Sequence, residues 1–270
     1  MKHNFKVNIP IAILITLIAV IYQRGTGPTY PKKFKVMDHK MKLLRSHGGE
    51  TDAPIEVPKI TETTTAKVTY KRYPTNDEWT TVPMSADGNM LKFGLPNQPP
   101  AGKLKYFIEL DIDGKKEFLG TESEPIIIRF KGDVPTAILA PHIFFMFFSM
   151  LLSVLAALEA FRKNEESFYM LTKATVFCLA VGGLILGPIV QKYAFGVYWA
   201  GFPFDWDLTD NKLLIAVIAW GTAFALNFRK RNRYATIVAA CVLIAVYSIP
   251  HSMQGSEYNY EEGKVVTDRD

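Results

Sequence analysis

Hydrophobic residues are collected in five runs along the chain instead of being spread evenly. The runs cover residues 7–22, 137–161, 168–190, 213–228 and 234–249. A helix rises about 1.5 Å per residue and bilayer hydrocarbon is about 30 Å thick, so roughly 20 apolar residues span it. The second and third runs reach that length, and flanking aromatic or basic side chains extend the other three. Because helices satisfy their own backbone in lipid, the pattern predicts five transmembrane helices.

The short connections between these runs differ in charge. Arg162 and Lys163 open one connection and residues 229–233 are densely basic, whereas residues 191–210 hold a single basic residue. Basic loops remain in the cytoplasm, so we expect both basic connections and the N-terminus inside and residues 251–270 outside. The expected location is the bacterial inner membrane, with the lipid bilayer as one partner.

The first apolar run has the basic start and short apolar centre of a signal peptide. Residues 18–24 offer no small-residue cleavage pattern, which favours an uncleaved signal anchor over residues 1–24. A cleaved signal peptide is the alternative, and it leaves the remaining topology unchanged.

Residues 25–133 are polar and contain no apolar run of helical length. Val68 and Tyr70 alternate with polar neighbours, and similar short segments follow, separated by turns at Gly88 and Gly114. This pattern predicts an antiparallel β-sandwich. Residues 70–84 and 95–118 resemble fibronectin type III or immunoglobulin-like domains of cell-envelope proteins, which implies a binding or spacing module.

The predicted fold class is an α-helical integral membrane protein of five transmembrane helices with an inserted all-β immunoglobulin/fibronectin-like sandwich. Its parts are the anchor at 1–24, the external sandwich with its N-terminal linker at 25–133, a four-helix bundle at 134–250 and an external polar tail at 251–270. The whole layout resembles that of bacterial envelope membrane proteins with such a domain.

Composition narrows the possible functions. The net charge of +5 is largely explained by the cytoplasmic clusters, so nucleic-acid binding is not indicated. Cys178 and Cys241 lie in predicted spans and are interpreted as packing residues. The sequence holds no phosphate loop, dinucleotide fingerprint, zinc-protease helix or nucleophile elbow, so a non-enzyme is favoured.

One candidate site lies on the predicted outer face. His142 and His251 each follow a proline at the outer end of a span, and residues 192–210 are rich in aromatic and acidic side chains. An interfacial aromatic belt explains the aromatics alone, a helix cap explains Asp207, and a hydrogen bond to a loop carboxylate explains His142. The sharper hypothesis is one pocket that binds a cofactor, with both histidines as metal ligands. Its residues are His142, His251, Tyr198, Trp199, Trp206 and Asp207.

Gly196-Val197-Tyr198-Trp199 and Trp206-Asp207 resemble the tryptophan-rich haem-handling segment of membrane cytochrome c assembly proteins. The resemblance implies an outer-face haem, with His142 and His251 in the place of the flanking ligands. In this chain residues 200–205 separate the two halves of the motif.

Two classes of function follow. The first is a non-catalytic accessory or assembly protein whose sandwich binds an envelope or respiratory partner. The alternative is a haem- or quinone-handling membrane protein with its site at the outer-face histidines and loop. An absorption spectrum of the purified protein would separate them.

Overall fold

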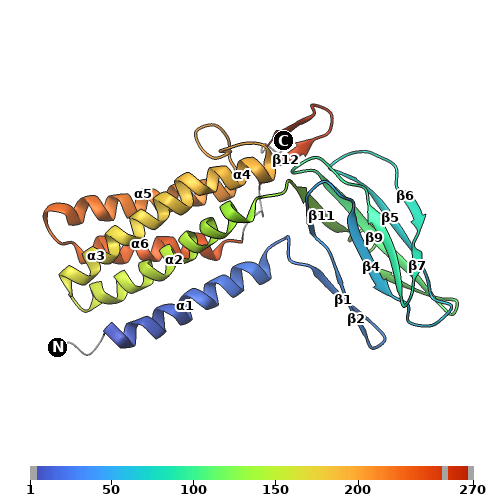
Figure 1. The fold of residues 1–270 in the computed structure, drawn as a ribbon, viewed down its shortest axis with the longest axis horizontal. Helices are drawn as coiled ribbons and strands as arrows, with labels where there is room; N and C mark the ends of the chain where they lie inside the picture. Colours follow the sequence, from blue (N-terminus) through green and yellow to red (C-terminus); the bar gives the residue numbers. More distant parts are fainter. Residues whose placement is uncertain (1–4, 251–254, 267–270) are drawn as a thin grey trace.

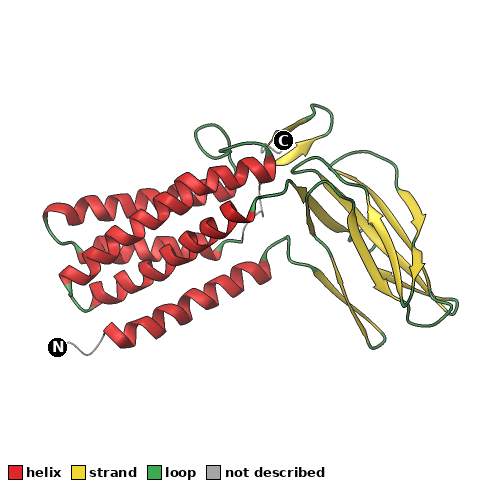
Figure 2. Cartoon of the chain, viewed as in Figure 1, coloured by secondary structure: helices red, strands yellow, loops and turns green. Residues whose placement is uncertain are grey.

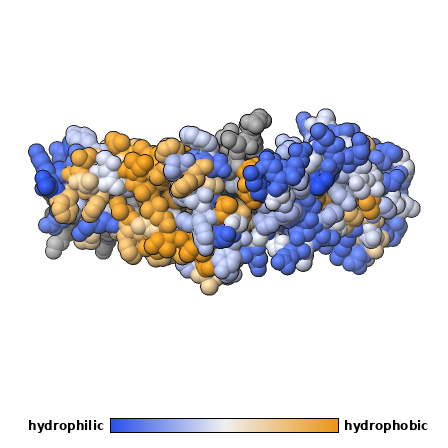
Figure 3. Space-filling model, turned by 90° about the horizontal axis from the view of Figure 1, so that it is seen from above, coloured by the Kyte–Doolittle hydropathy of each residue, from blue (hydrophilic) through white to orange (hydrophobic). Residues whose placement is uncertain are grey.

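The computed structural model describes residues 5–250 and 255–266, and it divides into a helical bundle and a β domain (Figure 1). The α-helices are α1 (Phe5–Thr26), α2 (Thr136–Phe161), α3 (Glu165–Leu179), α4 (Gly187–Phe195), α5 (Leu208–Arg229) and α6 (Arg233–Ser248). A π-helix, η1 (Ala180–Leu186), joins α3 to α4, so that these three form one long rod. On the face seen in Figure 3, apolar side chains gather over the middle of the bundle, and hydrophilic ones cover its far end and the β domain.

The prediction of five transmembrane helices is wrong for the described residues. Four helical segments are long and apolar enough to cross a membrane, and α6, with 16 residues, is shorter. The shortness has a local cause at both ends. Asn232 caps the start by accepting a hydrogen bond from Ala235 N (3.1 Å), and Pro250 disfavours a helical conformation at Ile249.

The β domain contains two main sheets (Figure 2). The six-stranded sheet contains β3 (Ser46–Gly48), β11 (Ile126–Lys131), β9 (Lys103–Ile112), β5 (Thr65–Tyr73) and β6 (Thr80–Pro83), with β10 (Lys115–Leu119) also paired to β9. The three-stranded sheet contains β4 (Ala53–Pro58), β8 (Met90–Leu95) and β7 (Ser85–Asp87). Two further hairpins are β1 (Lys32–Val36) with β2 (His39–Leu43), and β12 (Glu257–Asn259) with β13 (Lys264–Val266).

The prediction of an inserted, purely antiparallel sandwich is also wrong. Strand β3 pairs with β11 in parallel, so the larger sheet is mixed. The β domain is not a single insertion either, because the β12–β13 hairpin follows α6 in the sequence and packs against the β domain. Tyr258 N of this hairpin donates to Ala101 O (3.2 Å). Long-range pairings of this kind leave no local pattern in the sequence.

The core of the β domain follows from strand alternation. Along β9, every second side chain is buried, which places Tyr106, Ile108 and Leu110 between the sheets. Tyr106 is the one polar member of this buried row, and its hydroxyl donates to Leu44 O (2.8 Å). Burial raises the pKa of the Tyr106 phenol. The buried row of β9 is therefore apolar except for the Tyr106 hydroxyl, which has a hydrogen-bond partner.

Glycine lets the helices approach closely at the centre of the bundle. A Cβ atom at Gly182 would lie 2.7 Å from Phe145 Cβ on α2, and one at Gly183 would lie 2.4 Å from Leu213 Cδ1 on α5. Small residues at helix contacts are typical of membrane bundles. Both glycines lie in η1, so the π-helix is pressed between α2 and α5.

The C-terminal hairpin fastens the bundle to the β domain. Lys103 on β9 forms an ion pair with Glu257, and the Tyr260 hydroxyl lies 3.1 Å from both Lys103 N and Lys103 O. Residues 255–266 therefore pack on the β domain at the end of the bundle where α6 finishes.

Candidate functional site

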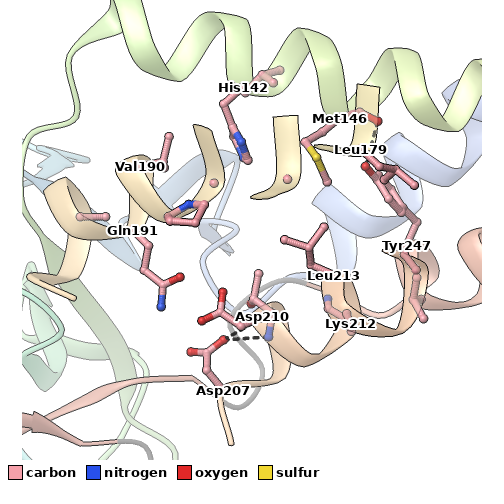
Figure 4. Close-up of a pocket in the computed structure, with 18 of the residues that line it drawn as sticks. His142, Met146, Leu179, Val190, Gln191, Asp207, Asp210, Lys212, Leu213 and Tyr247 are labelled. Carbon is pink, nitrogen blue, oxygen red and sulfur yellow. Dashed lines mark hydrogen bonds between the residues drawn. The ribbon is translucent and has the colours of Figure 1, made fainter. Parts of the chain in front are cut away.

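A cavity of about 370 Å³ lies inside the bundle at the end nearest the β domain (Figure 4). Residues from α2, α4, α5 and α6 form most of its wall, and Gly183 of η1 also lines it. Its apolar lining includes Leu139, Ile143, Met146, Val190, Leu213 and Val246. Its polar lining comprises Gln23, Arg129, His142, Gln191, Asp207, Thr209, Asp210, Lys212 and Tyr247. The cavity is thus apolar along the helices and polar toward the β domain.

His142 reaches this cavity from α2. Its Nδ1 lies 2.8 Å from Gly182 O, and a carbonyl oxygen can only accept, so Nδ1 carries the proton and donates. Gly182 O also accepts from Gly187 N, the five-residue spacing of a π-helix. The π-helix therefore fixes the tautomer of His142 and leaves Nε2 as the nitrogen with a lone pair.

Asp207 caps α5 and holds the C-terminal segment at the same time. One carboxylate oxygen accepts from Thr209 N (2.8 Å) and Asp210 N (3.3 Å), the geometry of an N-cap. The other accepts from Ser256 N (3.1 Å) and the Ser256 hydroxyl (3.3 Å). Asp207 is buried, and its hydrogen bonds account for both oxygens.

Asp210 and Lys212 follow in the first turn and a half of α5, and both are buried. Asp210 Oδ2 accepts from Ala200 N (2.6 Å), which folds the preceding loop back onto the helix. Lys212 Nζ donates to Ile249 O (2.8 Å) and Pro250 O (3.3 Å) just beyond the end of α6. The Asp210 carboxylate lies at the positive N-terminal end of the α5 dipole, and the Lys212 ammonium lies at the negative C-terminal end of the α6 dipole.

Arg129 and Gln23 complete the polar end. The Arg129 guanidinium lies over the Phe195 ring at 4.2 Å and donates to Ser256 O. Gln23, near the end of α1, places its buried Nε2 without a hydrogen-bond partner among the described residues. An amide donor left in this state is costly unless a ligand or water accepts from it.

The structure brings two of the predicted site residues, His142 and Asp207, to the cavity. The aromatic residues of the predicted site do not line it: Tyr198 is 60% exposed, Trp206 is 67% exposed, and Trp199 Nε1 donates to Phe202 O (3.2 Å) within the loop. His251 lies outside the described residues.

The described residues give haem binding no support. One imidazole, that of His142, lines the described part of the cavity, and the loop aromatics that would stack on a porphyrin lie outside it. Among residues 5–250 and 255–266, no group of three or more His, Cys, Asp or Glu side chains is placed so that it could hold a metal ion.

Sequence reasoning missed several residues of the cavity. Arg129 lay in a predicted strand and Gln23 in the predicted anchor, so neither was connected with the bundle. The hydrophobic pattern carried one usable signal, because Asp210 and Lys212 stand at the start of an apolar run where charges are unusual.

No family model, no curated protein and no solved structure matches the chain. The function is therefore inferred from the chain's own geometry.

Proposed function

We propose that the protein is a non-catalytic membrane accessory protein that binds a lipid-soluble amphiphile between its helices. The observation that carries this proposal is the cavity, apolar along the helices and polar at the end toward the β domain. Ligand sites are typically concave and mostly apolar, with a few polar groups that orient the ligand. An amphiphile from the bilayer would place its tail along Met146 and Leu213 and its head toward Gln23 and His142.

The orientation we propose places the β domain outside the bacterial inner membrane and the N-terminus inside. The supporting observation is the distribution of basic residues. Arg162, Lys163 and residues 229–233 lie at the end of the bundle away from the β domain (Figure 1). Short basic loops of this kind stay in the cytoplasm.

We further propose that the β domain is the part that contacts an envelope or respiratory partner. Arg129 at the end of β11 and Asp207 at the start of α5 both bind Ser256, so the β domain, the cavity rim and the C-terminal segment share one buried network. A ligand bound beside this network would affect the β domain through the contacts of Arg129 and Asp207 with Ser256.

The test is whether purified protein retains an amphiphile in the cavity. We expect lipid extraction and mass spectrometry to find one species enriched over the bulk lipid of the same membranes. Val190→Phe, which fills the cavity wall, should remove that species. Val238→Phe on α6, at a position 61% exposed on the outside of the bundle, should retain it.

Equal lipid content in the two variants would contradict the proposal. Both variants must first elute as single species and unfold at similar temperatures, so that loss of the ligand is not loss of the fold.

A further inference from the structure

We infer that the cavity takes a quinol, an uncharged hydroquinone head on an apolar tail, and that His142 reads its reduced state. The inference rests on the proposed function and names the ligand class of the same cavity. It depends on three features of the cavity: a nitrogen that can accept a hydrogen bond, an amide that can donate one, and a polar end whose charged groups contact the protein itself.

The acceptor is His142 Nε2. Because Nδ1 donates to Gly182 O, the neutral ring presents a lone pair at Nε2, which has no hydrogen-bond partner among the described residues. An imidazolium within the bundle, in a cavity whose lining includes Ile143, Met146 and Gly187, would be costly. The group that suits this position is a hydroxyl hydrogen of the ligand.

The donor is Gln23 Nε2, which lines the same cavity and lacks a partner within the described chain. An amide N–H suits a carbonyl, ether or phenol oxygen. A quinol ring carries oxygens on opposite sides, so one molecule can donate to His142 and accept from Gln23. A simple fatty alcohol has one such oxygen.

The charges at the polar end indicate an uncharged head. Two cations, Arg129 and Lys212, lie with two anions, Asp207 and Asp210, and all four contact the protein itself. A phosphate or carboxylate would compete with Ser256 O for Arg129 and with the carbonyls of Ile249 and Pro250 for Lys212, and it would lie near the carboxylates of Asp207 and Asp210. A neutral head leaves these contacts intact.

The depth of His142 agrees with an amphiphile entering from the bilayer. It lies six residues after Thr136, about 9 Å along α2 at 1.5 Å per residue. Beyond it, Met146, Leu179 and Ala216 continue the apolar wall toward the middle of the bundle. The tail would follow that wall.

The experiment is calorimetric titration of the full-length protein in lipid nanodiscs with decylubiquinol, kept reduced without oxygen, and with decylubiquinone. The quinone has no hydroxyl hydrogen for His142 but still accepts from Gln23. We expect wild-type protein to bind the quinol roughly tenfold more tightly, the effect of one well-made hydrogen bond.

His142→Phe should abolish the preference for the quinol, whereas His142→Gln, which keeps a polar acceptor, should preserve part of it. Gln23→Leu should weaken the binding of both probes. His39→Phe, an exposed change on β2, is the matched control and should leave both affinities unchanged.

Equal affinity of the wild-type protein for quinol and quinone would overturn the inference, as would dodecanol binding with the same dependence on His142. If neither probe binds while Val190→Phe still removes a retained lipid, the ligand class is wrong and the proposed function stands. If no variant changes lipid retention, both proposals fail.

Discussion

The two ends of the helical bundle both bury polar side chains, but they differ in whether those side chains satisfy one another. At the end away from the β domain, Glu159 accepts from Asn8 Nδ2 (2.6 Å) and Asn164 Nδ2 (3.1 Å). Asn227 Nδ2 lies 2.8 Å from Ala223 O and 3.2 Å from the Thr236 hydroxyl. These groups complete one another across α1, α2, α5 and α6.

At the end nearest the β domain the charged groups also contact the protein, yet the buried Gln23 Nε2 has no hydrogen-bond partner among the described residues, and His142, whose Nδ1 is bonded to Gly182 O, faces the same cavity. A buried polar network that is complete stabilises a fold, whereas leftover donors and acceptors are costly without a ligand. The comparison therefore assigns stability to one end and binding to the other. Mutations at the two ends should separate these roles.

The largest effect is expected from Glu159→Leu. The change removes the carboxylate that accepts from the buried amide of Asn8 and from the exposed amide of Asn164. Hydrogen bonds to a charged group contribute about 1.5–3 kcal/mol each, so we expect about 3–5 kcal/mol of lost stability. Thermal unfolding in detergent measures it, and Glu159→Gln should recover part of the loss because an oxygen acceptor remains. The folded fraction should still retain the amphiphile. Selective loss of the amphiphile with unchanged unfolding would reverse the roles of the two ends.

A smaller loss is expected from Asp207→Ala at the cavity end. The change removes the cap of α5 and both contacts to Ser256, so we expect about 2–4 kcal/mol of lost stability and release of the C-terminal hairpin. Limited proteolysis should cut residues 255–266 faster than in wild-type protein. Asp205→Ala in the same loop loses one hydrogen bond, from Trp206 N, and is the matched control. If the hairpin stays protected from proteolysis in Asp207→Ala, Asp207 does not hold the C-terminal hairpin in place.

Much of the layout could be predicted from hydrophobic pattern, because the pattern is local. The apolar runs became helices, and alternation along residues 103–112 became β9. The hairpin of β1 and β2 carried the same signal, in Lys-Phe-Lys-Val and Lys-Met-Lys-Leu, but was missed. The short length of α6 was readable from Asn232 and Pro250, which limit it at both ends.

The cavity could be predicted only in part, because its residues come from distant segments. His142 and Asp207 were marked by their chemistry, an intramembrane imidazole and an aspartate before a helix. Gln23 and Arg129 became relevant only once α1 and β11 were packed against the bundle. The π-helix that orients His142 was signalled only by Gly182, Gly183 and Pro188, and small residues with a proline are equally typical of an ordinary close contact.

The smallest effect in this series tests that π-helix. In Gly182→Ala the new methyl would meet Phe145 Cβ at 2.7 Å and Met146 N at 3.2 Å, so α2 and η1 must separate. Overpacking of this kind costs about 1–3 kcal/mol. Gly221→Ala on α5 is the matched control, because its methyl meets nothing within 4 Å and alanine favours a helix by about 0.5–1 kcal/mol over glycine. We expect Gly182→Ala to lower the unfolding temperature and Gly221→Ala to keep or raise it.

The separation of α2 from η1 in Gly182→Ala should also lengthen the hydrogen bond from His142 Nδ1 to Gly182 O. Gly182→Ala should therefore reduce ligand retention, whereas Gly221→Ala should not. Unchanged retention in a destabilised Gly182→Ala protein would show that η1 packs the bundle without orienting the histidine.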